Sequence, residues 1–169
     1  FKIGGTSVYV GIEGSNSAAG INSSRQQLMK EGDTPRPYKH YGRSKLMAEE
    51  LVRRAHESGK IEATILRPCW YYGPGQPQRQ TTLFTMINRG SAVLFGDGTN
   101  LRSMAYIDNV VQGLLLAEAG PASGQTYWIA DEYPYRTIDI YRTIADLLGV
   151  PLRVRRVPGI VSWLCEQMD

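Results

Sequence analysis

Residues 38–68, "YKHYGRSKLMAEELVRRAHESGKIEATILRP", join a helical pattern to a strand pattern through a short turn. Helical spacing of apolar side chains predicts a helix from about residue 37 to 57, and Gly59 is typical of the position after a helix end. The β-branched stretch 61–68 predicts a strand that stops at its proline. A helix followed at once by a strand is the repeating unit of α/β folds.

Two sets of side chains are expected on the 37–57 helix. Its buried stripe would consist of Leu46, Leu51, Val52 and Ala55. Two surface ion pairs, each one turn apart with the acid first, would be Glu49 with Arg53 and Glu50 with Arg54.

The alternation of strands and helices continues on both sides of this stretch. A short strand that runs into a glycine-rich loop is expected within 1–11, and a strand followed by a turn at 91–98. Further strands are expected at 125–131 and 151–158, and further helices at 82–90, 109–120 and 137–149. The loops are expected at 12–36, with one helical turn near Gln26–Met29, and at 69–80. Strands alternating with helices of this length predict an α/β fold built on a parallel sheet.

Composition excludes several classes of protein. The chain has 169 residues, 42% of them hydrophobic, and no apolar run near the roughly 20 residues of a membrane helix, so no membrane partner is expected. The net charge is only +3. The cluster Arg153, Arg155 and Arg156 is interpreted as the solvent-exposed face of a strand rather than a nucleic-acid site. Cys69 and Cys165 lack metal-ligand spacing, which suits a reducing cytoplasm and argues against a zinc site.

Both ends of the chain look interrupted. Phe1 begins a pattern typical of a buried strand, without a signal peptide or an initiating methionine, and "GIVSWLCEQMD", residues 159–169, stops inside a helical pattern. We therefore expect this sequence to be a piece of a longer polypeptide.

Tyr41 and Lys45 are one helical turn apart and so share one face of the expected helix. One interpretation is a tyrosine ring packed on a lysine stem. The other is a phenol that exchanges protons because a neighbouring ammonium ion stabilises its phenolate. The pair alone does not decide between them.

Two other segments fall at the ends of expected strands, where α/β folds bind ligands. "FKIGGTS" brings Thr6 and Ser7 to the end of the first strand, and "ILRPCWYYGPG", residues 65–75, follows the second. The order along the chain is strand with hydroxyl residues, YxxxK helix, then strand with RP and YGPG.

This order resembles the extended short-chain dehydrogenase/reductase family, which includes nucleotide-sugar epimerases, dehydratases and 3β-hydroxysteroid dehydrogenase-like enzymes. "YGRSK" at 41–45 resembles the YxxxK motif, "LRPCWYYGPG" at 66–75 the lRpxxvYGPg segment, and "GDGTNLRSMAYIDNVVQGLLLA" at 96–117 a further family segment. Aligning Gly11 with the family glycine puts Thr6 at the catalytic Ser/Thr position. The resemblance implies a Rossmann-type parallel sheet with helices on both faces.

The resemblance also implies catalytic and cofactor-binding roles. Tyr41 would be the general acid/base, Lys45 would hold the nicotinamide ribose beside it, and Thr6 would hydrogen-bond the substrate oxygen. The nicotinamide of NAD or NADP would border Pro68, Cys69 and Trp70. Thr6 could instead satisfy loop backbone.

Substrate-binding residues would be Ser7, Tyr71, Arg79 and Arg102. Arg102 matches an arginine that meets a phosphate in nucleotide-sugar enzymes, although a surface salt bridge is an alternative, and Tyr71 could simply pack. Two partners are expected. One is a small-molecule substrate, namely a nucleotide sugar, and the other is a second copy of the chain, bound through the 37–57 helix.

The family's GxxGxxG dinucleotide turn does not occur in the sequence, so its N-terminal dinucleotide-binding half is expected to be missing. We expect residues 1–76 to be the second half of the nucleotide domain and 77–169 a substrate-binding region that partly returns to the sheet. Gly4-Gly5 and Asn109 depart from the nucleotide-sugar pattern. A 3β-hydroxysteroid dehydrogenase-like enzyme and a catalytically silent scaffold therefore stay open beside an epimerase or dehydratase.

Overall fold

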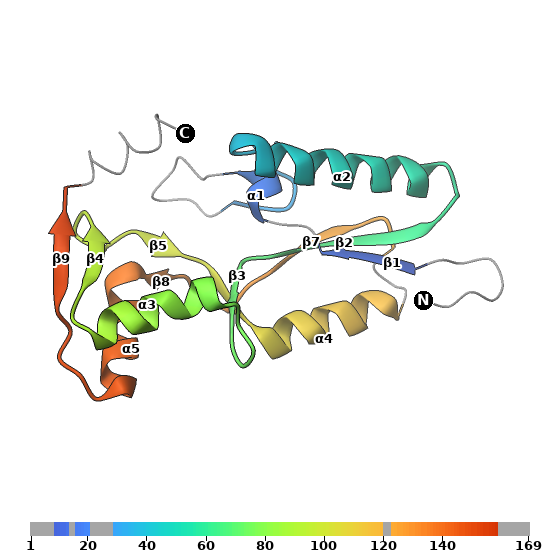
Figure 1. Cartoon of the computed structure of the whole chain (residues 1–169). Coiled ribbons are helices and arrows are strands. Elements are labelled where there is room, and N and C mark those ends of the chain that lie inside the picture. Colours follow the sequence, from blue (N-terminus) through green and yellow to red (C-terminus); the bar gives the residue numbers. More distant parts are fainter. Residues whose placement is uncertain (1–8, 14–15, 21–28, 120–122, 159–169) are drawn as a thin grey trace. The chain divides into compact units, whose positions relative to one another are not determined.

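The computed structural model describes residues 9–13, 16–20, 29–119 and 123–158 (Figure 1). Two compact units divide the chain. The first comprises Phe1–Gly73 and Met104–Glu132, and the second comprises Pro74–Ser103 and Tyr133–Asp169. The chain thus leaves the first unit after Gly73, and residues 104–132 return to it.

A three-stranded parallel sheet forms the first unit. Its strands are β1 (Tyr9–Glu13), β2 (Glu62–Pro68) and β7 (Thr126–Ile129), in the order β1-β2-β7. Every residue of β2 from Ala63 to Pro68 is buried, as expected for a central strand of apolar and β-branched residues. The predicted parallel sheet is confirmed.

Helices cover both faces of this sheet, as predicted (Figure 1). Helix α2 (Lys39–Glu57) lies on one face and α4 (Ile107–Glu118) on the other. Both lie within about two residues of their predicted ranges at 37–57 and 109–120. No helix among the described residues is both long and apolar enough to span a bilayer.

The predicted loop at 12–36 is wrong in two places. Strand β1 runs on to Glu13, and a one-turn helix, α1 (Asn16–Ala19), packs against α2. The packing is close at Gly42, where a Cβ atom would lie 2.5 Å from the Ser17 carbonyl oxygen. This approach explains the glycine inside the second turn of α2. Residues 1–8 and 26–28 lie outside the described part of the chain.

The predicted turn-rich loop at 69–80 is also partly wrong. It contains β3 (Trp70–Tyr72), which pairs in parallel with β6 (Met104–Tyr106), and the first residues of α3 (Gln78–Asn88). Three-residue strands are too short to show a periodicity in the sequence, so the pattern could not reveal β3.

The second unit contains α3 and α5 (Thr137–Leu148). Strand β4 (Ala92–Phe95) pairs in parallel with β9 (Val154–Val157), and β5 (Leu101–Arg102) pairs antiparallel with β8 (Tyr135–Arg136). Its core consists of Ile87, Ala92, Ile144 and Ala145. Helix α5 ends where Gly149 takes a left-handed φ of 66°, which confirms the predicted end of this helix.

Candidate active site

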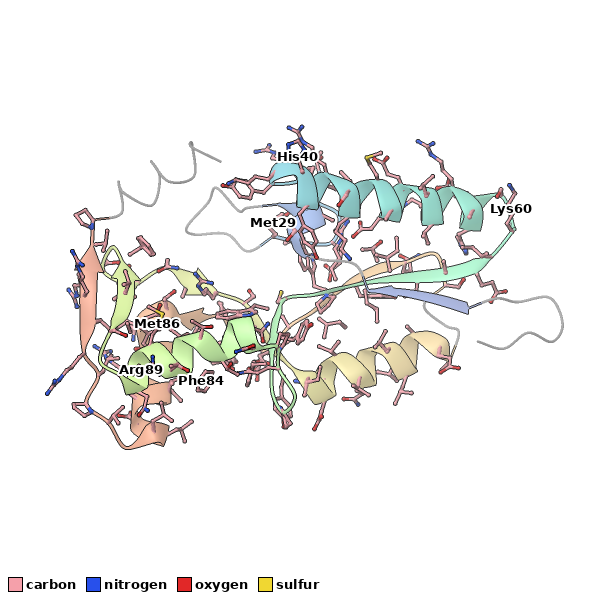
Figure 2. The ribbon with its side chains drawn as sticks, in the orientation of Figure 1. Met29, His40, Lys60, Phe84, Met86 and Arg89 are labelled. Atoms are coloured by element: carbon pink, nitrogen blue, oxygen red, sulfur yellow. The ribbon has the colours of Figure 1, made fainter. Side chains whose placement is uncertain are left out.

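The first two turns of α2 carry the predicted YxxxK pair. The structure brings the two side chains together, because the Lys45 Nζ lies 5.7 Å from the centroid of the Tyr41 ring. Tyr41 is 59% exposed, so its ring lies at the surface of the first unit. His40 beside it is exposed as expected, and Figure 2 shows it at the start of α2, with Lys60 beyond the opposite end. The pair is therefore open to a ligand.

The topology of the first unit decides at which edge of the sheet this pair lies. Helix α2 follows β1 and precedes β2, and the two strands are parallel, so α2 begins at their carboxyl edge (Figure 1). The predicted cofactor segment Pro68–Trp70 follows the end of β2 at the same edge. Tyr41 and Lys45 thus share a sheet edge with the segment predicted to border the nicotinamide.

Hydrogen bonds anchor the segment after β2. Cys69 is 7% exposed, and its backbone N–H donates to the Ile129 carbonyl oxygen at 2.9 Å, which continues the β2–β7 ladder by one residue. Burial, and secondly the negative charge of Asp131, raise the pKa of the Cys69 thiol to about 11. Cys69 is therefore a neutral thiol at physiological pH. Trp70 and Tyr71 are half-buried.

Asp131 organises a polar cluster that the sequence analysis missed. Its Oδ2 accepts a hydrogen bond from the Tyr72 hydroxyl at 3.0 Å, and its Oδ1 accepts one from the Tyr106 backbone N–H at 3.0 Å. The Asn109 amide also donates to Oδ1 at 3.4 Å. The rings of Tyr72 and Tyr106 stack at a tilt, with centroids 5.5 Å apart. The signal that could have found Asp131 is its place just after an apolar strand at the ligand-binding edge.

A buried ion pair connects α2 to β2. Arg67 donates from Nη2 to Glu49 Oε2 at 2.7 Å and from Nε to Oε1 at 3.1 Å and Oε2 at 3.2 Å. Glu49 is 0% and Arg67 2% exposed. The predicted surface pair of Glu49 with Arg53 is therefore wrong. The position of Arg67 is the sequence signal for this buried pair, because an arginine inside a buried strand needs a buried partner.

The predicted apolar stripe of α2 needs a related correction. The side chains of Leu46, Val52 and Ala55 are half-buried, but Leu51 is 65% exposed. Glu49, rather than Leu51, occupies the fully buried position on the helix. Pairing with Arg67 lets a carboxylate take a place for which the sequence pattern favours an apolar side chain.

The remaining predicted residues lie elsewhere. Arg102, on β5 in the second unit, is exposed, and Arg79 is on α3. Burial raises the pKa of Tyr141, whereas the positive charge of Arg102 lowers it, so these two side chains interact within the second unit. Thr6 and Ser7 lie outside the described residues. Among the described residues, no three His, Cys, Asp or Glu side chains are grouped as metal ligands.

Comparison with known proteins assigns the family. The model of the NAD dependent epimerase/dehydratase family matches residues 11–130. The chain belongs to this family, whose extended short-chain motifs it resembles in sequence. The protein y4nL of Sinorhizobium fredii is 39% identical over 166 residues, covering 94% of this chain and 47% of that protein.

Two further comparisons concern proteins whose name or bound ligand includes UDP-glucose. The UDP-glucose 4-epimerase of Vibrio cholerae is 30% identical over 131 residues, covering 76% of this chain and 40% of that protein. The solved structure of MoeE5 in complex with UDP-glucose and NAD has a TM-score of 0.77 and 27% identity, covering 89% of this chain and 52% of that chain. The chain thus spans about half the length of the proteins it matches. The family is NAD-dependent, and the solved neighbours include structures complexed with NAD or NADPH.

Proposed function

We propose that this chain supplies the acid/base and substrate-binding part of an enzyme that uses NAD or NADP to transfer hydride at a secondary alcohol carbon of a nucleotide sugar, as an epimerase or dehydratase. The observation that carries the proposal is the Tyr41–Lys45 pair, exposed at the carboxyl edge of a parallel sheet in a chain of this family. The UDP-glucose epimerase and MoeE5 comparisons support the sugar-nucleotide class.

Three side chains would handle the substrate oxygen. Tyr41 accepts the hydroxyl proton of the carbinol as hydride leaves the carbon, and returns it when hydride comes back. Lys45 stabilises the phenolate from one turn away, and Thr6 donates a second hydrogen bond to the same oxygen. The bound nicotinamide supplies the hydride acceptor and donor.

The residues present fit the nicotinamide end of the cofactor. Lys45 offers ammonium donors for the ribose hydroxyls, and Pro68 and Trp70 offer apolar surface. The Cys69 N–H donates to the Ile129 carbonyl oxygen, so this donor is already used within the sheet. The sequence has no GxxGxxG turn, and no pyrophosphate-binding residue is assigned to this chain.

Ser7, Tyr71, Arg79 and Arg102 would bind the substrate. An exposed guanidinium such as that of Arg102 matches a diphosphate, because its planar fork forms two parallel hydrogen bonds to phosphate oxygens. Tyr71 follows the cofactor segment directly, and a half-buried phenol there suits a sugar hydroxyl.

We further propose a cytoplasmic homodimer that forms through α2. Met47 and Leu51, one turn apart, are 63% and 65% exposed. Two large apolar side chains on the solvent face of a helix suit burial against a second copy of the same helix.

The test uses the full-length protein with NAD or NADP and a panel of UDP- and dTDP-sugars. Nuclear magnetic resonance of the sugar ring would report epimerisation or dehydration, and absorbance at 340 nm would report net oxidation. Conversion of at least one sugar nucleotide is expected. Conversion only of apolar alcohols such as sterols would overturn the substrate class, and no conversion of any secondary alcohol would overturn the enzyme and favour a scaffold.

A further inference from the structure

We infer that Glu49 and Arg67, with Trp128, are positioning residues that fix how far α2 is displaced along the sheet, and so hold Tyr41 and Lys45 level with the segment after β2. This inference rests on the proposed function, for which it identifies further contributing residues. We call these three residues the clasp. It joins one helix to two adjacent strands, because Glu49 lies on α2, Arg67 on β2 and Trp128 on β7.

Two neighbours in the clasp contact the Arg67 guanidinium. Glu49 engages both Nε and Nη2 of the guanidinium, and the Trp128 ring lies against it with its centroid 5.6 Å from Cζ. Arg67 and Trp128 are register partners in the β2–β7 ladder, so the contact lies across directly paired residues. A two-point carboxylate contact fixes both position and orientation, which a single charge contact does not.

Stability alone is a poor explanation for this arrangement. The Glu49 and Arg67 side chains are 1% and 3% exposed, so both charges have left water, and the desolvation penalty of such a pair often equals or exceeds its Coulomb energy. Apolar side chains of similar volume would hold the two elements together at least as well. A bidentate ion pair provides one defined register, which an apolar contact that can slide does not.

The clasp is placed so that this register determines the position of the Tyr41–Lys45 pair. Only residues 58–61 separate the end of α2 from the start of β2, so the helix and the strand run in opposite directions. Tyr41 lies eight residues before Glu49, or about 12 Å along the helix towards the carboxyl edge. Trp70 lies three residues beyond Arg67, or about 10 Å along the chain in the same direction. Aligning Glu49 with Arg67 therefore brings Tyr41 close to the level of Trp70.

A slip of α2 by one helical turn would move Tyr41 about 5.4 Å along the sheet. Misplacement of a catalytic group by about 1 Å can cost about 100-fold in rate. The clasp would thus affect turnover without touching substrate or cofactor.

The decisive experiment uses the full-length protein and three variants. Glu49→Gln keeps the shape of the side chain but removes its charge. The double variant Glu49→Leu/Arg67→Met replaces the ion pair by apolar side chains, and Glu50→Gln is the matched control, because Glu50 is the exposed neighbour on the same helix. The readouts are kcat, KM, the midpoint of urea unfolding, and hydrogen exchange of amides 39–45.

We expect kcat to fall at least 10-fold in Glu49→Gln and in the double variant, with KM within threefold of wild type and the control unchanged. The double variant should keep most of its stability, while amides 39–45 exchange faster than in the control. A double variant that regains wild-type kcat together with its stability would overturn the inference, as would Glu49→Gln with the kcat of Glu50→Gln.

Failure of the proposed function is separable from failure of this inference. If wild type converts no secondary alcohol, the proposed function has failed, and the exchange rates of amides 39–45 decide the role of the clasp. Equal exchange in Glu49→Gln and Glu50→Gln would then contradict a positioning role.

Discussion

The Tyr72 hydroxyl donates a hydrogen bond to Asp131 Oδ2 at 3.0 Å, across 59 residues of sequence. The bond joins the YGPG segment after β2 to the residues after β7. Replacing Asp131 with Ala leaves the Tyr72 hydroxyl and the Tyr106 N–H without this acceptor, so we expect a loss of about 1–3 kcal/mol in the free energy of unfolding.

A double-mutant cycle measures this bond directly. Tyr72→Phe, Asp131→Ala and the double variant would be compared with wild type by urea unfolding. A coupling of about 0.5–1.5 kcal/mol is expected. Strictly additive effects would show that the hydroxyl and the carboxylate do not stabilise one another.

Replacing Gly42 with Ala should lower the stability of the protein, whereas Gly→Ala in a helix usually raises it. At an exposed helix position Gly→Ala stabilises by about 1 kcal/mol. Here the new Cβ atom would lie 2.5 Å from the Ser17 carbonyl oxygen, so α1 must move and Gly42→Ala should destabilise by about 1–3 kcal/mol. The control is Gly32→Ala, where the added Cβ meets nothing within 4 Å. A stabilised Gly42→Ala protein would show that α1 does not pack at this position.

Cys69 makes stability depend on alkaline pH. Burial, and secondly Asp131, raise the pKa of its thiol from 9.0 to about 11 in the folded chain. Because the folded pKa is the higher one, the neutral thiol contributes fully to the free energy of unfolding below pH 9. This contribution is lost as the pH rises towards 11, and the loss reaches about 2 kcal/mol at pH 11.

The measurement compares urea unfolding of wild type and Cys69→Ala between pH 8 and 11. The stability of wild type relative to the variant should fall by about 2 kcal/mol over this range. In Asp131→Asn the fall should still begin near pH 9 but should be smaller and level off at a lower pH, because a charge that raises the folded-state pKa of Cys69 has been removed. A difference that does not change with pH would contradict a raised thiol pKa.

The exposed apolar face of α2 yields a prediction about assembly. Met47→Glu/Leu51→Glu should convert a dimer of the full-length protein to a monomer, because four charges would enter the shared interface. Light scattering after gel filtration measures the mass. Leu147→Glu on α5 is the matched control, since Leu147 is 80% exposed and lies in the second unit. A wild-type monomer, or a variant that stays dimeric, would exclude an α2 interface.

The sequence was sufficient to predict the elements that have a clear period. The observed bounds of α2, α4 and α5 lie within a few residues of the predicted ones, because each helix is long enough to show apolar periodicity. Strand β2 is predictable from its run of β-branched and apolar residues ended by a proline. Helix α1 and strand β3 are not, since four and three residues show no period. Local spacing favours Arg53 as the partner of Glu49 and so predicts a surface position, whereas the actual partner, Arg67, is 18 residues away. Spacing within one helix cannot predict an ion pair between residues that only the tertiary structure brings together.

The candidate site divides in the same way. Tyr41 and Lys45 were predictable because one helical turn determines their proximity. Asp131 was not, because it meets Tyr72 only through the order of strands in the sheet. The roles of Thr6, Ser7, Arg79 and Arg102 remain predictions from the family motifs.

The central claim is that the Tyr41 phenol moves the substrate proton. Its most direct test is single-turnover hydride transfer in full-length Tyr41→Phe, followed at 340 nm with a sugar nucleotide that the wild type converts. Loss of the general acid/base should slow this step about 100- to 10,000-fold while cofactor affinity and the urea midpoint stay near wild type. A Tyr41→Phe protein that transfers hydride at the wild-type rate would contradict the claim.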